Sequence, residues 1–512
     1  MLDTNYSPAL SFFKWSVLLL LLASIHAAFA DALQTPLERA HYARISTSGE
    51  ISQYLDQLVA RYPTLAHKDV LGDSVAGRPL EVLRLASPDL REPHFKVMII
   101  GSQHGAAEPA GGEALLVIAR ELSAGSLRSL LDDMEILVLP NANPDGRDLK
   151  RRSNAKRINI NTDFVLLSQP ESQQLLAAVT RYRPDALLDS HESAVLKRQT
   201  LARAGYLTDF NAQFEISNNP AVPAMLRDYA LRELLPPLLQ RVTAGGLPAQ
   251  RYIGEITSLK QAVTNGGLTL RNFRNAAGIA GGLSLLVETK LDPKTGTYPT
   301  YRNIAVRVDR QLLCLRSFIT VIHQQRAAIR AKVMAARAAL THAPLILFAG
   351  YASDTAHAEV EIPLRRIAGG QLETLKFRDH RQVITADKIP YPPMLVITAH
   401  VDKLRDVIER HGINVWSLDH PTSAEVWAER YRARPTLNGR AELTTETKKT
   451  INIESGALFM DLAQPNGRAA ALLLNPRSPS SLFRTPEYAG LLLPNQEFFV
   501  YRTYKGATRS PP

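Results

Sequence analysis

Four continuous apolar runs mark the first part of the chain, and each has the length of a strand. They cover residues 95–100, 134–139, 186–189 and 283–288. Runs of this kind are typical of strands that are covered on both faces. Apolar residues at helical spacing lie around these runs, at 48–62, 109–123 and 310–342. The alternation predicts an α/β fold, in which a mixed, mostly parallel sheet is flanked by helices.

The pattern changes after Pro344. Short strand-like runs separated by Pro, Asn and Gly turns follow at 345–348, 394–398, 470–474 and 498–501, with one helix at about 401–411. We therefore predict a larger α/β domain over 31–342 and a smaller β-rich accessory domain over 343–512. A chain of 512 residues also exceeds what one hydrophobic core usually covers.

The N-terminal segment has the parts of a secretory signal peptide. Lys14 precedes an apolar run at 17–23, and Ala28-Phe29-Ala30 offers small residues for cleavage after about Ala30. The run is too short to span a bilayer, and an uncleaved anchor or a buried helix are the alternatives. We predict that residues 1–30 are a signal peptide, that the protein is periplasmic or secreted, and that the mature chain has no transmembrane segment.

Cys314 is the only cysteine, and it lies within the apolar pattern Leu312-Leu-Cys-Leu315. This context predicts a buried small hydrophobe rather than a nucleophile or a metal ligand. No disulfide can form within the chain, and an exported protein without disulfides is typical of a bacterial periplasm.

The chain is basic, with a formal net charge of +11 and a pI of about 9.6. Export and the absence of a recognisable binding motif argue against nucleic acid as a partner. Anionic cell-wall polymer or a membrane surface would be attracted by the same field. An ordinary basic surface without such a partner explains the charge equally well.

Polar motifs stand at the carboxyl ends of the predicted strands. Ser102-Gln-His-Gly-Ala-Ala-Glu-Pro109 follows the first strand, and Asn143-Pro-Asp-Gly146 follows the second. Asp189-Ser-His191 and then Glu288 end the other two strands. Because open α/β sheets place their sites at the carboxyl ends of strands, we expect these motifs to share one crevice.

In this order the motifs resemble the zinc carboxypeptidase family of metallopeptidases, from about Thr47 to about Lys290. The resemblance implies one zinc ion per chain, bound by His104, Glu108 and His191. Two imidazoles and one carboxylate hold a catalytic zinc while leaving a fourth position open for water. The domain over 31–342 is then the catalytic domain.

The same resemblance implies roles for further residues. Glu288 takes a proton from the water and passes it to the leaving amine, and Arg152 stabilises the negative charge of the tetrahedral intermediate. Asn161 and Thr162 occupy positions at which the family binds its substrate. These roles imply an exported zinc-dependent metallopeptidase that hydrolyses amide bonds in peptides. Peptidoglycan-derived cell-wall peptides are candidate substrates.

The chain departs from the family's pattern near the ligands. The usual spacing is His-x-x-Glu, whereas one more residue separates His104 from Glu108. We expect the loop to absorb this residue, and we expect Glu113, the next carboxylate, on the helix surface. Asn159 replaces an aspartate that orients a ligand imidazole in the family, so it keeps an acceptor oxygen but loses the charge.

Thr162 stands where the family has an arginine that forks onto the terminal carboxylate of the substrate. One hydroxyl cannot replace two charged donors. We predict either that the substrate lacks a free α-carboxylate there, or that Arg147 or Arg151 supplies the cation. The family also commonly has a mobile tyrosine upstream of the catalytic glutamate, and Tyr252 is available for this position.

Two alternatives remain at the level of sequence. An aspartoacylase-like N-acyl amidohydrolase shares the zinc geometry, although Asn143-Pro-Asp-Gly146 and the large accessory domain favour the peptidase. A degenerate member that binds peptide or glycan without turnover would explain Asn159 and Thr162. Such a binder needs neither a base nor an oxyanion donor, so Glu288 and Arg152 argue against it.

Overall fold

The computed structural model describes residues 33–503 without 93, 195–200, 209, 292–302, 354–357 and 435–440. An eight-stranded sheet with the order β1-β2-β4-β3-β5-β9-β7-β8 forms its centre. The four strands β4, β3, β5 and β9 run parallel, and β2 and β7 flank them antiparallel. The strands are β1 (Ala66–Asp73), β2 (Pro79–Leu85), β3 (Phe95–Gly101), β4 (Met134–Leu139), β5 (Ala186–Ala194), β7 (Ala212–Ile216), β8 (Ala249–Arg251) and β9 (Leu283–Leu291).

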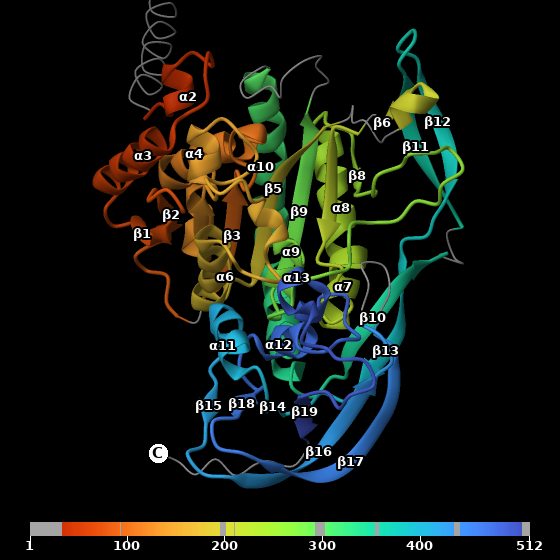
Figure 1. Cartoon of the computed structure of the whole chain (residues 1–512). Helices are drawn as coiled ribbons and strands as arrows, with labels where there is room; N and C mark the ends of the chain where they lie inside the picture. The colour runs from red at the N-terminus through yellow and green to blue at the C-terminus, as the bar shows by residue number, and fades with distance from the viewer. Residues whose placement is uncertain are drawn as a thin grey trace, which may run out of the picture.

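Helices cover both faces of this sheet, which confirms the predicted fold class (Figure 1). One apolar core joins the sheet to α2 (Pro36–Arg39), α3 (Ser48–Arg61), α4 (Ala110–Ala124), α7 (Ala224–Tyr229), α8 (Leu235–Ala244) and α10 (Ile304–Ala339). On the other face, α6 (Pro170–Tyr182) and α9 (Phe273–Gly278) pack against a second core. The three predicted helices correspond to α3, α4 and α10, and Cys314 is buried on α10 as predicted.

The C-terminal region is rich in strands, as predicted. A six-stranded sheet has the order β15-β18-β14-β19-β16-β17. Its strands are β14 (Met394–Ile397), β15 (Trp416–Ser417), β16 (Thr422–Tyr431), β17 (Leu443–Ile453), β18 (Leu458–Asp461) and β19 (Val500–Thr503). Its helices are α11 (Val401–Arg410), α12 (Gly467–Leu473) and α13 (Pro486–Ala489).

One predicted strand of this region is wrong. Residues 470–474 belong to α12 and its C-cap rather than to a strand. The apolar run is buried all round, and such a run fits a buried helix as well as a buried strand.

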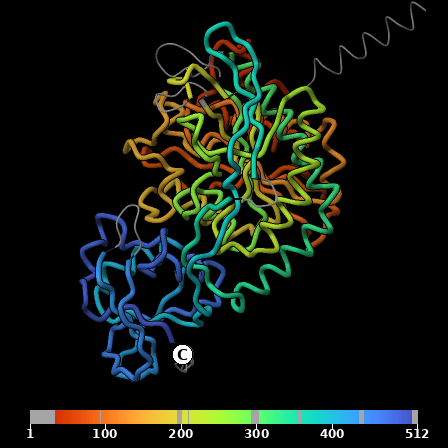
Figure 2. Tube along the Cα trace, turned by 90° about the vertical axis from the view of Figure 1, so that its right-hand side faces the viewer, coloured from red at the N-terminus to blue at the C-terminus, as the bar shows by residue number. Residues whose placement is uncertain are grey.

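The C-terminal region is also tied to the larger lobe. The hairpin of β11 (Glu359–Arg366) and β12 (Leu372–Arg378) pairs with β6 (Tyr206–Thr208), and Figures 1 and 2 show it rising along the larger lobe. A ribbon of β10 (Leu345–Ala352) and β13 (Gln382–Ile389) lies at its base. The core of the C-terminal region includes Val165 and Leu270 from the larger lobe. The boundary at residue 343 stays a prediction, and the two parts share apolar cores across it.

The predicted signal peptide, residues 1–30, lies outside the described residues. Among the residues that are described, no helix is both long and apolar enough to cross a bilayer.

Candidate active site

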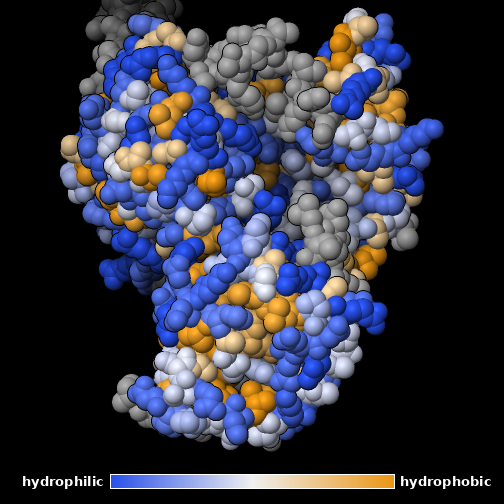
Figure 3. Space-filling view, viewed as in Figure 1, coloured by the Kyte–Doolittle hydropathy of each residue, from blue (hydrophilic) through white to orange (hydrophobic). Residues whose placement is uncertain are grey.

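The site forms where the parallel strands end. His191 on β5 lies opposite Glu288 on β9, and Glu288 lies opposite Gln213 on β7, so the three residues form one row across the sheet. Figure 3 shows that the surface is hollowed over β5 and β9, between the lobe of α4 and the β6–β11–β12 sheet. The predicted crevice is therefore present.

His104, Glu108 and His191 come together in this crevice. Their exposed fractions are only 3%, 4% and 2%, and one ligand atom from each lies within 4.8 Å of the others. A single turn of 3₁₀ helix, η1 (Gly105–Ala107), separates the first two and absorbs the extra residue of the spacing. The structure thus assembles the predicted ligand set despite the departure from His-x-x-Glu.

Gly105 is the point at which the loop of 102–109 contacts the motif of 143–146. Its φ is +51°, and a Cβ built there would lie 2.5 Å from the carbonyl carbon of Gly146. The ligand loop therefore packs directly on the short helix α5 (Pro144–Asp148). Asn143 caps this helix by accepting from Gly146 N at 2.9 Å and donates to Gln103 O at 3.1 Å.

The side chains fit a metal ion. Nδ1 of His104 is buried without a hydrogen-bond partner among the described residues, and Nδ1 of His191 lies 3.1 Å from Oε2 of Glu108. Burial lowers the pKa of His104 to about 3, so its imidazole is neutral. Burial opposes the charge of Glu108, but His104 and Arg152 outweigh this effect and keep its pKa low. Neutral imidazole and ionised carboxylate are the forms that bind zinc.

Asp189 orients the second imidazole. Its Oδ2 lies 2.8 Å from Nε2 of His191 and accepts from Nε2 of Gln103 at 2.6 Å. Burial lowers the pKa of His191, but Asp189 and Glu108 outweigh it and raise that pKa well above its usual value, so a metal ion bound here would displace the proton that His191 otherwise carries. We expected Asn159 to take an orienting role, but it accepts from Asn161 N at 3.2 Å and caps η3 (Ile160–Thr162). The sequence could have indicated this role of Asp189, because residues two apart on a strand, such as Asp189 and His191, point to the same face.

Arg152 lies beside the ligands. Its guanidinium donates to Oε1 of Glu108, and its Nη2 lies 2.8 Å from Nε2 of His104. The side chain is 46% exposed, so this cation borders both the ligands and the open crevice. It can therefore reach negative charge that develops on a substrate in the crevice.

Tyr252, the tyrosine that the sequence offers upstream of Glu288, interacts with Glu288. Burial and then the charge of Glu288 raise the pKa of Tyr252. This interaction places the phenol near the carboxylate.

Asn161 and Thr162 flank the ligand group. Nδ2 of Asn161 lies 3.5 Å from Nε2 of His191, and its Oδ1 accepts from Phe273 N at 3.0 Å. Thr162 is exposed, and its hydroxyl donates to Asn159 O at 3.0 Å.

Our expectation for Glu113 is wrong. Its exposed fraction is 1%, and it pairs with Nη1 of Arg147 at 2.8 Å and accepts from Ser46 N at 2.8 Å. Arg147 also donates to Ser102 Oγ at 2.7 Å and to Ser46 O at 3.0 Å. The guanidinium of Arg147 is therefore bound within the interior. Arg147 is not the cation that replaces the family's arginine at the position of Thr162.

Arg151 is not the replacement cation either. Its Nη2 donates to Asn154 O at 2.7 Å and to Ala155 O at 2.8 Å. These bonds fold the side chain back onto its own loop.

A buried support behind the ligands was not predicted. Arg307 of α10 donates from Nε to Oε1 of Glu192 at 2.7 Å, and Oε2 of Glu192 accepts from Ala110 N at 3.0 Å. Gln311 of α10 donates to His191 O at 2.7 Å and to Thr289 Oγ1 at 2.8 Å. This helix therefore fixes β5, β9 and the start of α4 relative to one another.

A second buried polar group, around Glu215, was also not predicted from the sequence. Glu215 shares the sheet face of Glu288, because it lies two residues beyond Gln213 on β7. Burial raises the pKa of Glu215, against the opposing charges of Arg274 and Arg251. Arg274 donates to Asn218 Oδ1 at 2.9 Å, which places a cation behind this wall of the crevice.

A second group of histidine and carboxylates and a small cavity also occur among the described residues, but neither competes with this site. Glu92, His94 and Glu135 also cluster, but Lys96 and Arg84 already pair with their carboxylates.

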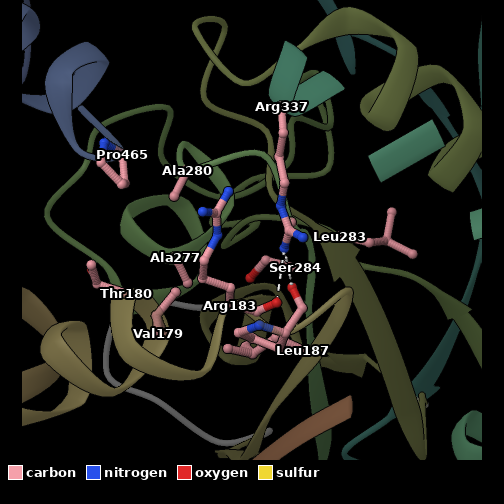
Figure 4. Close-up of a pocket in the computed structure, with 12 residues that line it drawn as sticks. Val179, Thr180, Arg183, Leu187, Ala277, Ala280, Leu283, Ser284, Arg337 and Pro465 are labelled. Atoms are coloured by element: carbon pink, nitrogen blue, oxygen red, sulfur yellow. Dashed lines mark hydrogen bonds between the residues drawn. The ribbon is translucent and has the colours of Figure 1, made fainter. Parts of the chain in front are cut away.

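A cavity of about 20 Å³ lies at the opposite ends of β5 and β9 (Figure 4). Arg337 points into it and donates to Arg183 O at 3.0 Å and to Pro184 O at 2.8 Å. The cavity has room for about one water molecule and is too small for a substrate.

Comparisons with known proteins agree with this geometry. Residues 51–193 match the family model described as zinc carboxypeptidase. The chain is 26% identical over 246 residues to carboxypeptidase 2 of Trichophyton rubrum, covering 46% of this chain and 45% of that protein. It is 29% identical over 200 residues to probable carboxypeptidase 2 of Arthroderma benhamiae, covering 38% of each. The chain thus spans less than half the length of these curated relatives.

Solved structures with a similar arrangement include a metallo-carboxypeptidase from Burkholderia cenocepacia, with a TM-score of 0.43, 18% identity, and coverage of 55% of this chain and 70% of that one. Carboxypeptidase A from Helicoverpa armigera has a TM-score of 0.41 and 15% identity, covering 55% and 75%. The family match contains the ligands and Arg152, whereas Glu288 and the C-terminal region lie beyond it.

Proposed function

Because the chain carries a zinc carboxypeptidase domain, we propose that it is an exported zinc-dependent metallopeptidase that hydrolyses amide bonds in peptides. The observation that carries the proposal is the convergence of His104, Glu108 and His191 within 4.8 Å at the strand ends. One zinc ion per chain would be held by these three side chains. When bound there, zinc would lower the pKa of a water molecule and polarise the substrate carbonyl.

Residues around the ligands carry out proton transfer and charge stabilisation. Glu288 accepts a proton from the attacking water and delivers it to the leaving amine. Its position opposite His191 supports this role, because the two side chains share one row of the sheet. Arg152 faces the same crevice and stabilises negative charge on the former carbonyl oxygen. Tyr252 lies near Glu288 and can contact the substrate beside the base.

Export and substrate class are further parts of the proposal. The sequence of residues 1–30 supports a cleaved signal peptide and a periplasmic or secreted location. Cell-wall peptides are substrates that an exported peptidase meets there. The net charge of +11 would favour association with anionic cell-wall polymer or a membrane surface.

Metal analysis combined with hydrolysis of a small peptide library tests the proposal. We expect one zinc per chain and peptide cleavage that stops when zinc is removed by a chelator and returns when zinc is restored. Stoichiometric zinc without hydrolysis of any peptide would instead favour the binding protein. Cleavage of N-acyl amino acids in preference to peptides would favour the N-acyl amidohydrolase.

A further inference from the structure

Glu192 directly follows the candidate ligand His191 on β5, and it is buried behind the ligand group. Arg307 of α10 holds its carboxylate with two hydrogen bonds, from Nε to Oε1 at 2.7 Å and from Nη2 to Oε2 at 2.8 Å. Neither side chain of this pair is exposed. Successive side chains of a strand point to opposite faces, so Glu192 points away from the crevice that His191 faces.

Glu192 binds the chain on both sides of Pro109. Its Oε2 accepts from the backbone N–H of Ala110, the first residue of α4, at 3.0 Å. Pro109 has no side-chain acceptor for this helix start, so the carboxylate of Glu192 takes the place of a capping side chain. The main chain of Glu192 contributes as well, because its N–H donates to Oε2 of Glu108 at 3.2 Å.

Glu108 is the candidate ligand that these bonds reach. It stands between the single 3₁₀ turn that follows His104 and the start of α4, so the helix start limits where its side chain can lie. Oε2 of Glu108, which accepts from Glu192 N, also lies 3.1 Å from Nδ1 of His191. Hydrogen-bonded neighbours of this kind orient ligating carboxylates and preserve metal affinity.

Stability alone does not account for a charged pair at this place. Burial removes the hydration of both charges, and apolar residues of similar volume are often as stable as a buried ion pair or more so. Gln311 lies four residues after Arg307, on the same side of α10, and donates to His191 O at 2.7 Å. Two polar side chains of this helix thus bind successive residues of β5 beside the ligand group, which favours a positional role.

We propose that Glu192, held by Arg307, is a positioning residue for Glu108. The inference rests on the zinc site of the proposed function. Glu192 acts without touching substrate, because it fixes Glu108 through the start of α4 and through its own N–H. Without its carboxylate, the segment 104–110 becomes more mobile and the chain binds zinc more weakly.

Two double variants of the full-length chain separate the acceptor oxygen from the buried charges. Glu192→Leu with Arg307→Met removes both charges and the acceptor for Ala110 N, whereas Glu192→Gln with Arg307→Met removes the charges but keeps an acceptor. Competition with a chelator measures zinc affinity. We expect the leucine variant to bind zinc about 10- to 100-fold more weakly than the parent, the usual cost of losing a partner of a metal ligand. The glutamine variant should restore most of the affinity.

Amide hydrogen exchange of the metal-free protein provides a second measurement, which does not depend on zinc. Residues 104–110 should exchange faster in the leucine variant than in the parent, and the glutamine variant should again exchange slowly. Urea unfolding of the same preparations checks that both variants keep a similar overall stability. Glu192→Asp keeps the charge beside Arg307, but it is too short to reach Ala110 N as well. It should show the same changes, and it decides the question if the leucine variant does not fold.

Glu429→Leu with Arg502→Met is the matched control, because it removes another buried ion pair, of 2.7 Å, from the C-terminal sheet. It should change neither zinc affinity nor the exchange of 104–110. Exchange of this segment at the parent's rate in the leucine variant would overturn the inference, as would an equal loss of zinc affinity in the control. A parent protein that binds no zinc would reject the proposed function, and the exchange rates would still decide whether Glu192 positions Glu108.

Discussion

His191 and Glu288 lie directly opposite each other on the neighbouring parallel strands β5 and β9. Side chains opposite each other in a sheet point to the same face, so the ligand imidazole and the carboxylate face one crevice. Gln311 joins the two strands from the other side by donating to His191 O and to Thr289 Oγ1. The separation between the candidate ligand His191 and the proposed base Glu288 is therefore set by the sheet rather than by a loop.

Replacing Glu288 by Gln should remove hydrolysis while leaving zinc and fold in place. The amide keeps the shape of the side chain but cannot accept the proton, and a positioned general base contributes roughly two to four orders of magnitude. Peptide turnover, zinc content and the unfolding midpoint of the same preparation check this. A variant that hydrolyses peptides at nearly the wild-type rate would exclude Glu288 as the base.

The metal ligands can be tested separately. His104→Ala, Glu108→Ala and His191→Ala should each lose stoichiometric zinc after dialysis, because a catalytic site with three protein ligands does not tolerate the loss of one. His94→Ala is the matched control, since His94 also lies in a group of histidine and carboxylates, where Lys96 already pairs with Glu92. Retention of zinc by His191→Ala, or its loss from His94→Ala, would contradict the assignment.

The sequence predicted the central sheet and the candidate ligands because both follow from local patterns. Continuous apolar runs identified the parallel strands, and the strands carry His104, His191 and Glu288 at or near their carboxyl ends. The extra residue before Glu108 needed only one 3₁₀ turn, which a loop can form without disturbing its neighbours.

Other features depend on residues that are distant in the chain. Glu113 is buried because Arg147 and Ser46 meet it from two other segments, and neither is visible in the helical pattern around Glu113. The β11–β12 hairpin reaches back to β6, and this long-range pairing has no local signature. The helix at 467–473 was mistaken for a strand because a short buried apolar run does not distinguish the two.

Glu113→Ala should destabilise the protein by about 3–5 kcal/mol. It leaves the fully buried guanidinium of Arg147 without its carboxylate, and uncompensated buried charges are costly. The free energy of unfolding in urea measures the effect. Asp132→Ala is the control, because its ion pair with Arg128 is exposed and should contribute about 1 kcal/mol or less. Equal stability of the two variants would show that the buried pair does not hold α4 to α5.

His411 should make the stability of the full chain depend on pH below neutrality. It is buried where α11 meets the catalytic domain, with Nε2 at 3.0 Å from Val165 O. Burial lowers its pKa from the ordinary 6.5 to about 4. Between these values the unfolded chain binds a proton that the folded chain does not. The stabilisation is therefore complete above pH 6.5 and falls by roughly 3 kcal/mol as the pH approaches 4.

The variant His411→Gln isolates this contribution. Glutamine can donate to Val165 O but does not titrate, so its free energy of unfolding should fall less than that of the wild type between pH 7 and pH 4. Urea unfolding of the full chain at a series of pH values gives both curves, and the carboxylates that titrate in this range affect both alike. His420→Gln, at an exposed histidine, should follow the wild-type curve. Parallel curves for His411→Gln and the wild type would show that His411 is not the group that loses stabilisation in acid.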